Sequence, residues 1–388
     1  MRPYWPVLWA LPLASCQHCA PPSTPDDPKP AAVPAPMVSV APPPTRVGPP
    51  PAVDAATARP PALLAPKAPA RLWKSPPSPA LADATWTGPL DPKLDAGWLA
   101  RLAGAPIESV TLNRGGSSIT LRARFADGQR AALKPEQRRW RVGHRAEIAA
   151  YHLDRALGLG RVAPVAGRRL PHAELRAHLV ASGADGEWLA RFDDEVTVRE
   201  GVVEVAAIAW HSRTLVSVEP PRDWLDGLSA DAPLRPALTP RLGEWSDMLV
   251  FDALIDNTDR WSGGNILGLG KDGPLILLDQ AAGFNPTRRE PVLDRRVQSL
   301  CRFRRETVAA LAALRAGGAV KLLSTSLDHD ALAPVLTPAQ LASFDGRSEL
   351  LERHIESCVE RLGSERVHTL QSPPLDDAAA DTSPEASH

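Results

Sequence analysis

The sequence lacks the features that identify several common protein classes. Its net charge is −1 over 388 residues, which gives no reason to expect a nucleic acid or another polyanion as partner. No run of about 20 apolar residues is present, so no ordinary transmembrane helix is expected. Neither a Gly-x-Ser-x-Gly nucleophile motif nor a Gly-x-x-x-x-Gly-Lys-Ser loop occurs, so acyl transfer and P-loop chemistry lose support.

Cysteine is scarce, and the spacing of the four cysteines suits neither a zinc site nor a redox pair. Cys16 and Cys19 lie near the N-terminus, whereas Cys301 and Cys358 lie in the part that is expected to fold. In an exported protein the latter two could form a disulfide, because they would meet an oxidising compartment. Two buried free thiols are the alternative.

Proline is abundant, with 42 residues, and twenty of them lie between Pro21 and Pro79. That segment has few large apolar residues and cannot bury enough surface to offset chain entropy. Residues 17–92 are therefore predicted to be a disordered, partly polyproline-like linker. Residues 367–388 are acidic and rich in small residues, and we expect a disordered tail there. The folded domain is then expected over residues 93–366.

The N-terminus has the pattern of an export signal. Arg2 is followed by a short apolar run from Tyr4 to Ala14, and the run ends in Leu13-Ala14-Ser15-Cys16. These four residues resemble a bacterial lipoprotein box, in which the cysteine is acylated. The prediction is a signal over residues 1–16, a lipidated Cys16 that anchors the chain to a membrane, and an exported bacterial cell-envelope lipoprotein, either periplasmic or surface-facing. A plain signal peptide with an incidental cysteine is the alternative.

The first half of the folded part has the pattern of a β-rich unit with one helix. Apolar residues alternate over 119–125, Asp127-Gly128 is a hairpin signal, and the return strand over 131–134 ends at Pro135. Helical spacing follows over 145–157. Weaker patterns give an edge strand over 162–165, a helix over 172–182, and strands near 202–208 and 214–218.

The second half is predicted to be mainly helical, with a central hairpin. A buried helix over 244–255 leads into the polar turn 256–260. Two short strands follow, over 265–269 and 275–278, joined by the turn residues 271–274. The remaining chain is predicted to form helices over 305–314, 338–344 and 348–362.

Two acidic residues flank that central hairpin, Asp259 before it and Asp279 after it. Because a hairpin returns the chain, both carboxylates can face one cleft. Asp259 could then accept the proton of an acceptor hydroxyl, and Asp279 could hold a divalent metal ion, with Asn265 as a further metal ligand or a brace for the loop. Two polar turn residues around a hairpin are the alternative interpretation.

Several residues earlier in the chain could bind a nucleotide. Lys134 ends a strand and could reach phosphates, and Glu147 on the following helix could pair with it. A Gly-rich turn with Gly115, Gly116 and Ser117 could let backbone approach the phosphates. A surface lysine, a surface glutamate and an ordinary turn are the alternatives.

These residues resemble the secretory-pathway kinase family, which includes the Golgi casein kinase, the xylose kinase of proteoglycan linkers and, more distantly, the four-jointed kinases. The resemblance covers residues 112–363. It is carried by Ala132-Leu133-Lys134-Pro135, Ala146-Glu147-Ile148-Ala149-Ala150-Tyr151-His152, Asp256-Asn257-Thr258-Asp259-Arg260, Leu278-Asp279-Gln280, Cys301-Arg302-Phe303-Arg304 and Cys358-Val359-Glu360-Arg361-Leu362-Gly363.

The resemblance implies an α+β, two-lobed atypical protein-kinase-like fold, with a β-rich N-lobe over about 93–170 and a helical C-lobe over about 171–366. It implies ATP with Mn²⁺ or Mg²⁺, Lys134 on the phosphates with Glu147 as its partner, Asp259 as catalytic base and Asp279 as metal ligand. It also favours a structural disulfide that involves Cys301 and Cys358.

The chain departs from the family at Val142, where the family usually has an acidic residue that helps to hold metal, and at Gln280, where asparagine is common. The leading hypothesis is an exported kinase that transfers the γ-phosphate of ATP to a hydroxyl of a protein Ser/Thr or of a glycan. An envelope-tethered pseudokinase that binds or scaffolds a partner is one alternative. A lipid-kinase-like or toxin-kinase-like phosphotransferase is another.

Overall fold

The computed structural model describes residues 92–371, apart from residues 114–117, 140–142, 212–214, 231–232, 262–264, 271–272 and 286–290. The predicted signal, the lipidated Cys16, most of the linker and most of the tail therefore lie outside the described residues. The same holds for the glycine turn with Gly115, Gly116 and Ser117, and for Val142.

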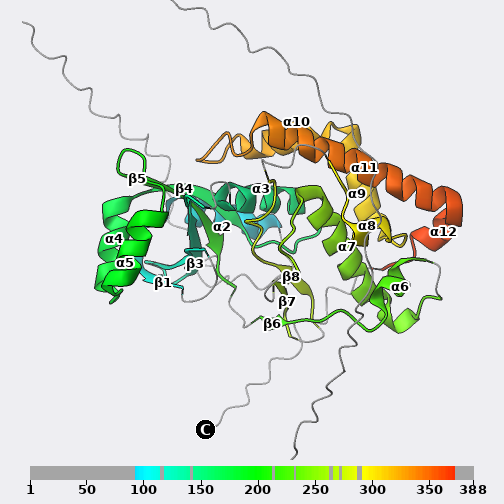
Figure 1. Cartoon of the computed structure of the whole chain (residues 1–388), viewed down its shortest axis with the longest axis horizontal. Helices are drawn as coiled ribbons and strands as arrows, with labels where there is room; N and C mark the ends of the chain where they lie inside the picture. Colours follow the sequence, from blue (N-terminus) through cyan, green and yellow to red (C-terminus); the bar gives the residue numbers. More distant parts are fainter. Residues whose placement is uncertain are drawn as a thin grey trace, which may run out of the picture. The chain divides into compact units, whose positions relative to one another are not determined.

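A five-stranded antiparallel sheet forms the N-terminal part (Figure 1). In spatial order its strands are β1 (Ile107–Leu112), β2 (Leu121–Phe125), β3 (Arg130–Pro135), β5 (Val202–Ala209) and β4 (Val165–Pro171). In β2 the apolar Leu121, Ala123 and Phe125 are buried and the arginines between them are exposed, as the alternation predicted. Because β5 lies between β3 and β4, the sheet extends well beyond the expected lobe boundary at residue 170.

The helices of this part pack against the sheet. Helix α3 (Gly143–Ala156) buries ten residues, among them Glu147, Ile148 and Leu153. Helix α2 (Pro92–Gly104) contacts β4 and β5. Helices α4 (His172–Ala181) and α5 (Gly186–Glu195) contact each other and lie side by side at one end of the sheet (Figure 1). Helix α5 was not predicted, although Asp185 caps its first turn by accepting a hydrogen bond from the Trp188 N–H.

The rest of the described chain is mainly helical. Helix α7 (Thr239–Ile255) is buried along almost its whole length. A second, smaller sheet contains β6 (Val216–Ser217), β7 (Ile266–Gly268) and β8 (Leu275–Leu277), with β7 in the middle. The other elements are α6 (Trp224–Leu228), a 3₁₀ turn (Pro236–Leu238), α8 (Arg295–Gln298), α9 (Arg305–Ala316), α10 (Ala319–Leu327), α11 (Pro338–Leu362) and α12 (Ser364–Val367).

The two helices that were expected over 338–344 and 348–362 are one continuous helix, α11, so that expectation was wrong. The expected break lay at residues 345–347, which include Gly346. In the structure a Cβ at Gly346 would lie 2.7 Å from Cγ of Pro291. The glycine permits a close approach of another segment, and the helix continues through it.

Several contacts fasten α3 and the sheet to the helical part. The Arg145 side chain donates to the main-chain oxygens of Leu332 and Pro334. The Gly167 N–H donates to Asp330 Oδ2 at 2.8 Å. These bonds tie α3, which carries Glu147, and strand β4 to the segment between α10 and α11.

Cys301 and Cys358 form a disulfide, with 5.5 Å between their Cα atoms. The bond joins the segment before α9 to α11, and both cysteines are buried. The prediction of a disulfide is confirmed, and the alternative of two free thiols is wrong.

Among the described residues, no single helix is long and apolar enough to cross a membrane. Of the helices that the structure describes, one pair, α9 and α10, reaches the required length and composition when taken together, and its two members are bent by 89° relative to each other.

Candidate active site

Lys134 lies between two carboxylates that come from distant parts of the chain. Its Nζ is 2.6 Å from Glu147 Oε1 on α3 and 2.8 Å from Asp279 Oδ1, just beyond β8. The expected pairing of Lys134 with Glu147 is therefore present, and the surface alternative is excluded because both side chains are buried. The Asp279 side chain keeps 42% of its surface exposed, so it is the most accessible member of the trio.

The charges of these three groups stabilise one another. Burial alone would lower the pKa of Lys134, but the negative charges of Glu147 and Asp279 raise it above its ordinary value. For Asp279, burial acts to raise the pKa, but the charge and hydrogen bond of Lys134 lower it overall. Burial raises the pKa of Glu147, and Lys134 opposes that rise. The site thus holds an ammonium ion against an ionised Asp279.

The second acidic residue, Asp259, lies in the loop after α7. Helix α7 ends at Asp256, whose left-handed backbone (φ 57°) turns the chain out of the helix. The loop is then held by side chains: Asn257 Oδ1 accepts from the Asp259 N–H at 3.1 Å, and Asn265 Nδ2 donates to the Asp259 carbonyl at 2.9 Å. Asp259 is exposed. Asn265 thus braces the loop, whereas its role as a metal ligand stays a prediction.

Arg260 links that loop to the hairpin and to α7, a role that the sequence analysis did not assign. Its guanidinium is completely buried and binds both carboxylate oxygens of Asp252, at 3.0 to 3.3 Å. It also donates to the main-chain oxygen of Leu278 at 2.6 Å and to that of Asn265 at 3.2 Å. An arginine directly after a candidate catalytic aspartate is the only sequence signal for this arrangement.

Gln280, noted in the sequence only as a departure from the family, is also completely buried. Its N–H donates to Glu147 Oε1 at 2.9 Å, and its side-chain oxygen accepts from Arg260 at 2.6 Å. The residue therefore touches both the lysine-glutamate pair and the residues of the Asp259 loop.

A cavity of about 670 Å³ opens beside the trio. Lys134, Glu147, Asp279 and Asn265 line its polar part. The remaining lining includes apolar residues of both sheets and the segment after β5: Ala132, Val162, Ala163, Val165, Ile208, Ala209, Trp210, Leu215, Leu267, Leu277 and Leu278. An apolar wall next to a lysine and carboxylates suits a molecule with an aromatic end and a phosphorylated end.

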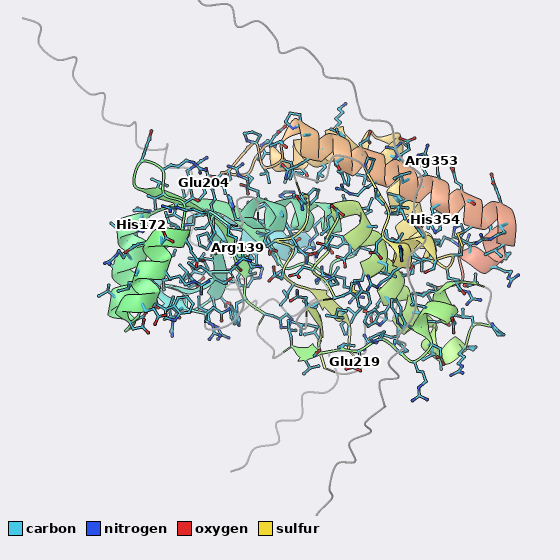
Figure 2. The ribbon with its side chains drawn as sticks, in the orientation of Figure 1. Arg139, His172, Glu204, Glu219, Arg353 and His354 are labelled. Carbon is cyan, nitrogen blue, oxygen red and sulfur yellow. A yellow bond between two sulfur atoms is a disulfide. The ribbon has the colours of Figure 1, made fainter. Side chains whose placement is uncertain are left out.

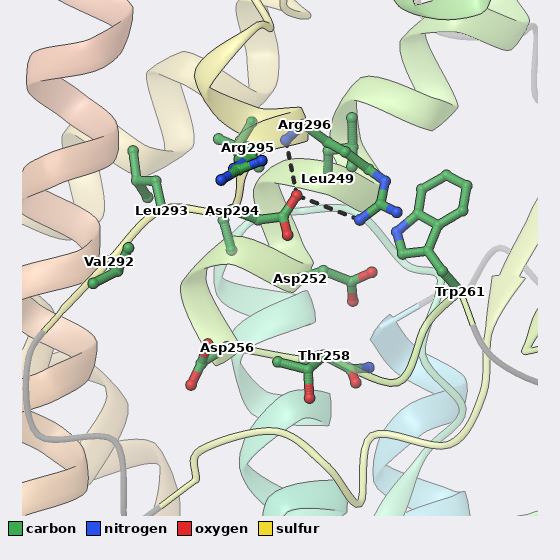
Figure 3. Close-up of a pocket in the computed structure, with 13 residues that line it drawn as sticks. Leu249, Asp252, Asp256, Thr258, Trp261, Val292, Leu293, Asp294, Arg295 and Arg296 are labelled. Carbon is green, nitrogen blue, oxygen red and sulfur yellow. Dashed lines mark hydrogen bonds and ion pairs between the residues drawn. The ribbon is translucent and has the colours of Figure 1, made fainter. Parts of the chain in front are cut away.

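A second cavity, of about 470 Å³, lies on the α8 side of the same loop (Figure 3). Asp256, Asn257, Thr258 and Trp261 of the loop line it, together with the segment from Val292 to Val297. The Arg296 guanidinium lies over the Trp261 ring, 4.6 Å from its centroid. Trp261 also stacks on Trp224, with 5.4 Å between ring centroids. The segment around Asp259 thus borders two cavities. Asn265 contributes to the larger one, which contains Lys134 and Asp279, and Trp261 contributes to the smaller one, which is lined by charged side chains.

Another group of side chains has the composition of a metal site but is engaged otherwise. Ligand atoms of Glu136, His144 and Glu204 lie within 4.8 Å of one another, and Figure 2 labels Glu204 at the sheet. Glu136 is bound by both guanidinium nitrogens of Arg199, and Glu204 by Arg145 and Arg169. Because arginines already neutralise both carboxylates, we interpret this cluster as structural.

Comparison with known proteins agrees with this geometry. The family model described as "Golgi casein kinase, C-terminal, Fam20" matches residues 232–367. This chain is related to the Golgi casein kinase family. It is 27% identical to the mouse pseudokinase FAM20A over 317 residues, which cover 69% of this chain and 59% of the relative. It is 28% identical to the zebrafish glycosaminoglycan xylosylkinase over 352 residues, which cover 77% of this chain and 84% of the relative.

The solved structures show that the fold is shared. A crystal structure of the Golgi casein kinase with Mn and ADP bound superposes with a TM-score of 0.59 at 19% identity, and the match covers 74% of this chain and 81% of that one. The expected two-lobed α+β fold, with a sheet-rich N-lobe and a helical C-terminal region, is confirmed. The chain spans 59% of the length of the first relative above.

The expected location in a bacterial cell envelope is contradicted by these relatives. The curated relatives come from animals. Two of the matches have names that refer to the Golgi or to the extracellular space, the Golgi casein kinase and the human extracellular serine/threonine protein kinase FAM20C. The lipoprotein interpretation gave too much weight to a four-residue pattern in front of a cysteine, and Cys16 itself lies outside the described residues.

Proposed function

We propose that the protein is a metal-dependent kinase that transfers the γ-phosphate of ATP to a hydroxyl group of a protein or glycan acceptor. The observation that carries this proposal is the position of Lys134, held by Glu147 and Asp279 at the polar end of the larger cavity. Phosphoryl transfer depends mainly on positioned charge, and a buried lysine paired with a helix glutamate is the arrangement that kinases use to hold phosphates.

Each side chain has a defined task in this proposal. Lys134 binds phosphate oxygens, and Glu147 keeps the ammonium group aimed at them. Asp259, exposed in a loop whose backbone is held by Asn257 and Asn265, accepts the proton of the acceptor hydroxyl. The apolar wall of the larger cavity takes the base of the nucleotide.

The donor set near Lys134 fits a divalent ion. Mg²⁺ and Mn²⁺ prefer carboxylate oxygens, and the partly exposed Asp279 carboxylate supplies them. The charge and hydrogen bond of Lys134 lower the pKa of this carboxyl overall, which favours its ionised form. Such an ion would neutralise charge on the phosphates. The neighbour that was solved with Mn and ADP supports this choice of cofactors.

The smaller cavity is our candidate for the acceptor site, because the loop with Asp259 forms one of its walls. Among the relatives, one is named a xylosylkinase and another a serine/threonine protein kinase, so both acceptor classes occur among them. A glycan and a Ser-containing protein are therefore both to be tested as acceptors.

The test is transfer of labelled γ-phosphate in the presence of Mn²⁺ or Mg²⁺. Lys134→Met and Asp279→Ala should each reduce the rate by at least about 100-fold. The first removes the positive charge that binds the phosphates, and the second removes the carboxylate that would hold the metal ion. Asp194→Asn is the control, since Asp194 is an exposed carboxylate that pairs with the exposed Arg138. Transfer that survives Asp279→Ala at the wild-type rate would contradict the proposal.

A second candidate is a pseudokinase that binds nucleotide without transferring phosphate. It is favoured by the valine at position 142, where the family usually has an acidic residue, and by the likeness to the pseudokinase FAM20A. Nucleotide-dependent thermal stabilisation, together with no transfer to any acceptor and no effect of Asp259→Ala, would select this candidate.

A further inference from the structure

We propose that Gln280 is a positioning residue, which sets the Asp259 loop relative to the Lys134–Glu147 pair. This inference rests on the proposed function, because it concerns how that site is held together. Gln280 follows Asp279 directly and is completely buried, so any movement of its backbone also moves the carboxylate beside it.

The backbone of Gln280 is fastened to the N-terminal part of the site. Its N–H donates to Glu147 Oε1 at 2.9 Å, and the same oxygen accepts a hydrogen bond from Lys134 Nζ at 2.6 Å. The lysine and the Gln280 N–H therefore share one carboxylate oxygen. This shared acceptor fixes the distance between α3 and the chain that follows β8.

The side chain of Gln280 is fastened to the C-terminal part of the site. Its Oε1 accepts from Arg260 at 2.6 Å and from Asn257 Nδ2 at 3.2 Å, and its Nε2 donates to the Leu277 carbonyl at 2.9 Å. The orientation of the amide is unambiguous, because the reverse orientation would place its NH₂ group against two donors. The acceptor oxygen is thus the atom that matters.

Asn257 extends this connection to the candidate base. While its Nδ2 donates to Gln280, its Oδ1 accepts from the Asp259 N–H at 3.1 Å. A continuous path of hydrogen bonds runs from Glu147 through Gln280 and Asn257 to the backbone of Asp259. Every side chain on that path between Glu147 and Asp259 is buried.

Such a path acts on the reaction through geometry. Displacement of a catalytic group by about 1 Å can cost about 100-fold in rate, even when the altered residue does not touch the substrate. Gln280 lines neither cavity. Its loss should therefore lower kcat while leaving the binding of nucleotide nearly unchanged.

The experiment compares three variants of the full chain in the phosphotransfer assay. Gln280→Met keeps the volume but removes the acceptor oxygen, and we expect kcat to fall about 10- to 100-fold, with KM for ATP within about threefold of wild type. Gln280→Glu restores an acceptor oxygen for Arg260 and Asn257 and should be at least about tenfold more active than Gln280→Met.

Thr307→Val is the matched control for lost stability. It also removes one buried hydrogen bond, the one that the Thr307 hydroxyl donates to Asp247 at 2.5 Å, but it lies between α7 and α9, away from both cavities. The proposal is overturned if Gln280→Met keeps kcat within about twofold of wild type, or if Thr307→Val loses as much kcat as Gln280→Met.

Amide hydrogen exchange tests the same inference without turnover. In Gln280→Met, the amides of residues 257–261 should exchange about tenfold faster than in wild type, whereas Thr307→Val should leave them unchanged. Unchanged exchange in Gln280→Met would refute the positioning role even in a chain without activity. A wild-type chain that transfers no phosphate would refute the proposed function, and faster exchange in the variant would still support the positioning role.

Discussion

Replacing Arg260 by methionine should strongly destabilise the protein. Arg260 has no exposed surface, and its ion pair with Asp252 is buried as well, since Asp252 is only 7% exposed. Methionine fills similar space but leaves Asp252 as a buried carboxylate without its cation. Removal of one partner of a buried ion pair typically costs about 3 to 5 kcal/mol, and the same loss is expected in the free energy of unfolding here.

The pH dependence of that loss gives a second, independent check. Burial raises the pKa of Asp252 above its ordinary value of 3.8, and the charge of Arg260 opposes the rise. Without Arg260 the pKa of the folded state rises further, so folding then takes up a proton. Since a neutral carboxyl tolerates burial, the variant should lose less stability at about pH 5 than at about pH 8.

Urea denaturation of wild type, Arg260→Met and Arg138→Met at both pH values measures these effects. Arg138 and its partner Asp194 are exposed, so Arg138→Met should cost less than about 1 kcal/mol. The reasoning would be refuted if Arg260→Met remained within about 1 kcal/mol of wild type, or if its loss were larger at the lower pH.

Three further predictions concern stability. Changing Cys301 and Cys358 to serine should lower the free energy of unfolding by about 2 to 4 kcal/mol, and guanidinium denaturation showing no change would count against a structural role. Gly167→Ala should cost about 1 to 3 kcal/mol, because its Cβ would lie 2.2 Å from Asp330 Oδ1; an unchanged Tm would contradict this. Burial lowers the pKa of His144 from 6.5 to about 4. Because the unfolded chain then takes up this proton at a higher pH than the folded chain, the free energy of unfolding should fall by up to about 3 kcal/mol as the pH drops from 6.5 towards 4. His144→Gln should flatten this dependence in thermal denaturation between those pH values, and an equally steep profile would exclude His144 as its source.

Regular local patterns were enough to predict most of the individual elements. The alternation over 119–125, the hairpin signal at Asp127-Gly128 and the apolar periodicity over 244–255 correspond to β2, the β2–β3 turn and α7. These signals are local, since each depends on which side of one strand or helix faces the core. The prediction was weakest over 171–240, where α5 was not found and the lobe boundary was placed before β5.

A single sequence cannot show which close contacts its glycines permit. The pattern predicted two helices with a break at residues 345–347, whereas in the structure Gly346 makes room for Pro291 inside the continuous helix α11. A glycine can end a helix or can permit the close approach of another segment, and only the position of that segment in the fold decides between the two.

For the candidate site, the sequence by itself determined the residue types and their order: a lysine at the end of a strand, a glutamate on the next helix, and two aspartates around a hairpin. It also determined the pair of cysteines that the structure joins. The tertiary structure decided which of these groups meet. It placed Lys134 and Asp279, 145 residues apart, within 2.8 Å, and it gave Arg260 and Gln280 their partners. Contacts of this kind depend on how β3, α3 and the hairpin pack, and long-range packing leaves no periodic trace in the sequence.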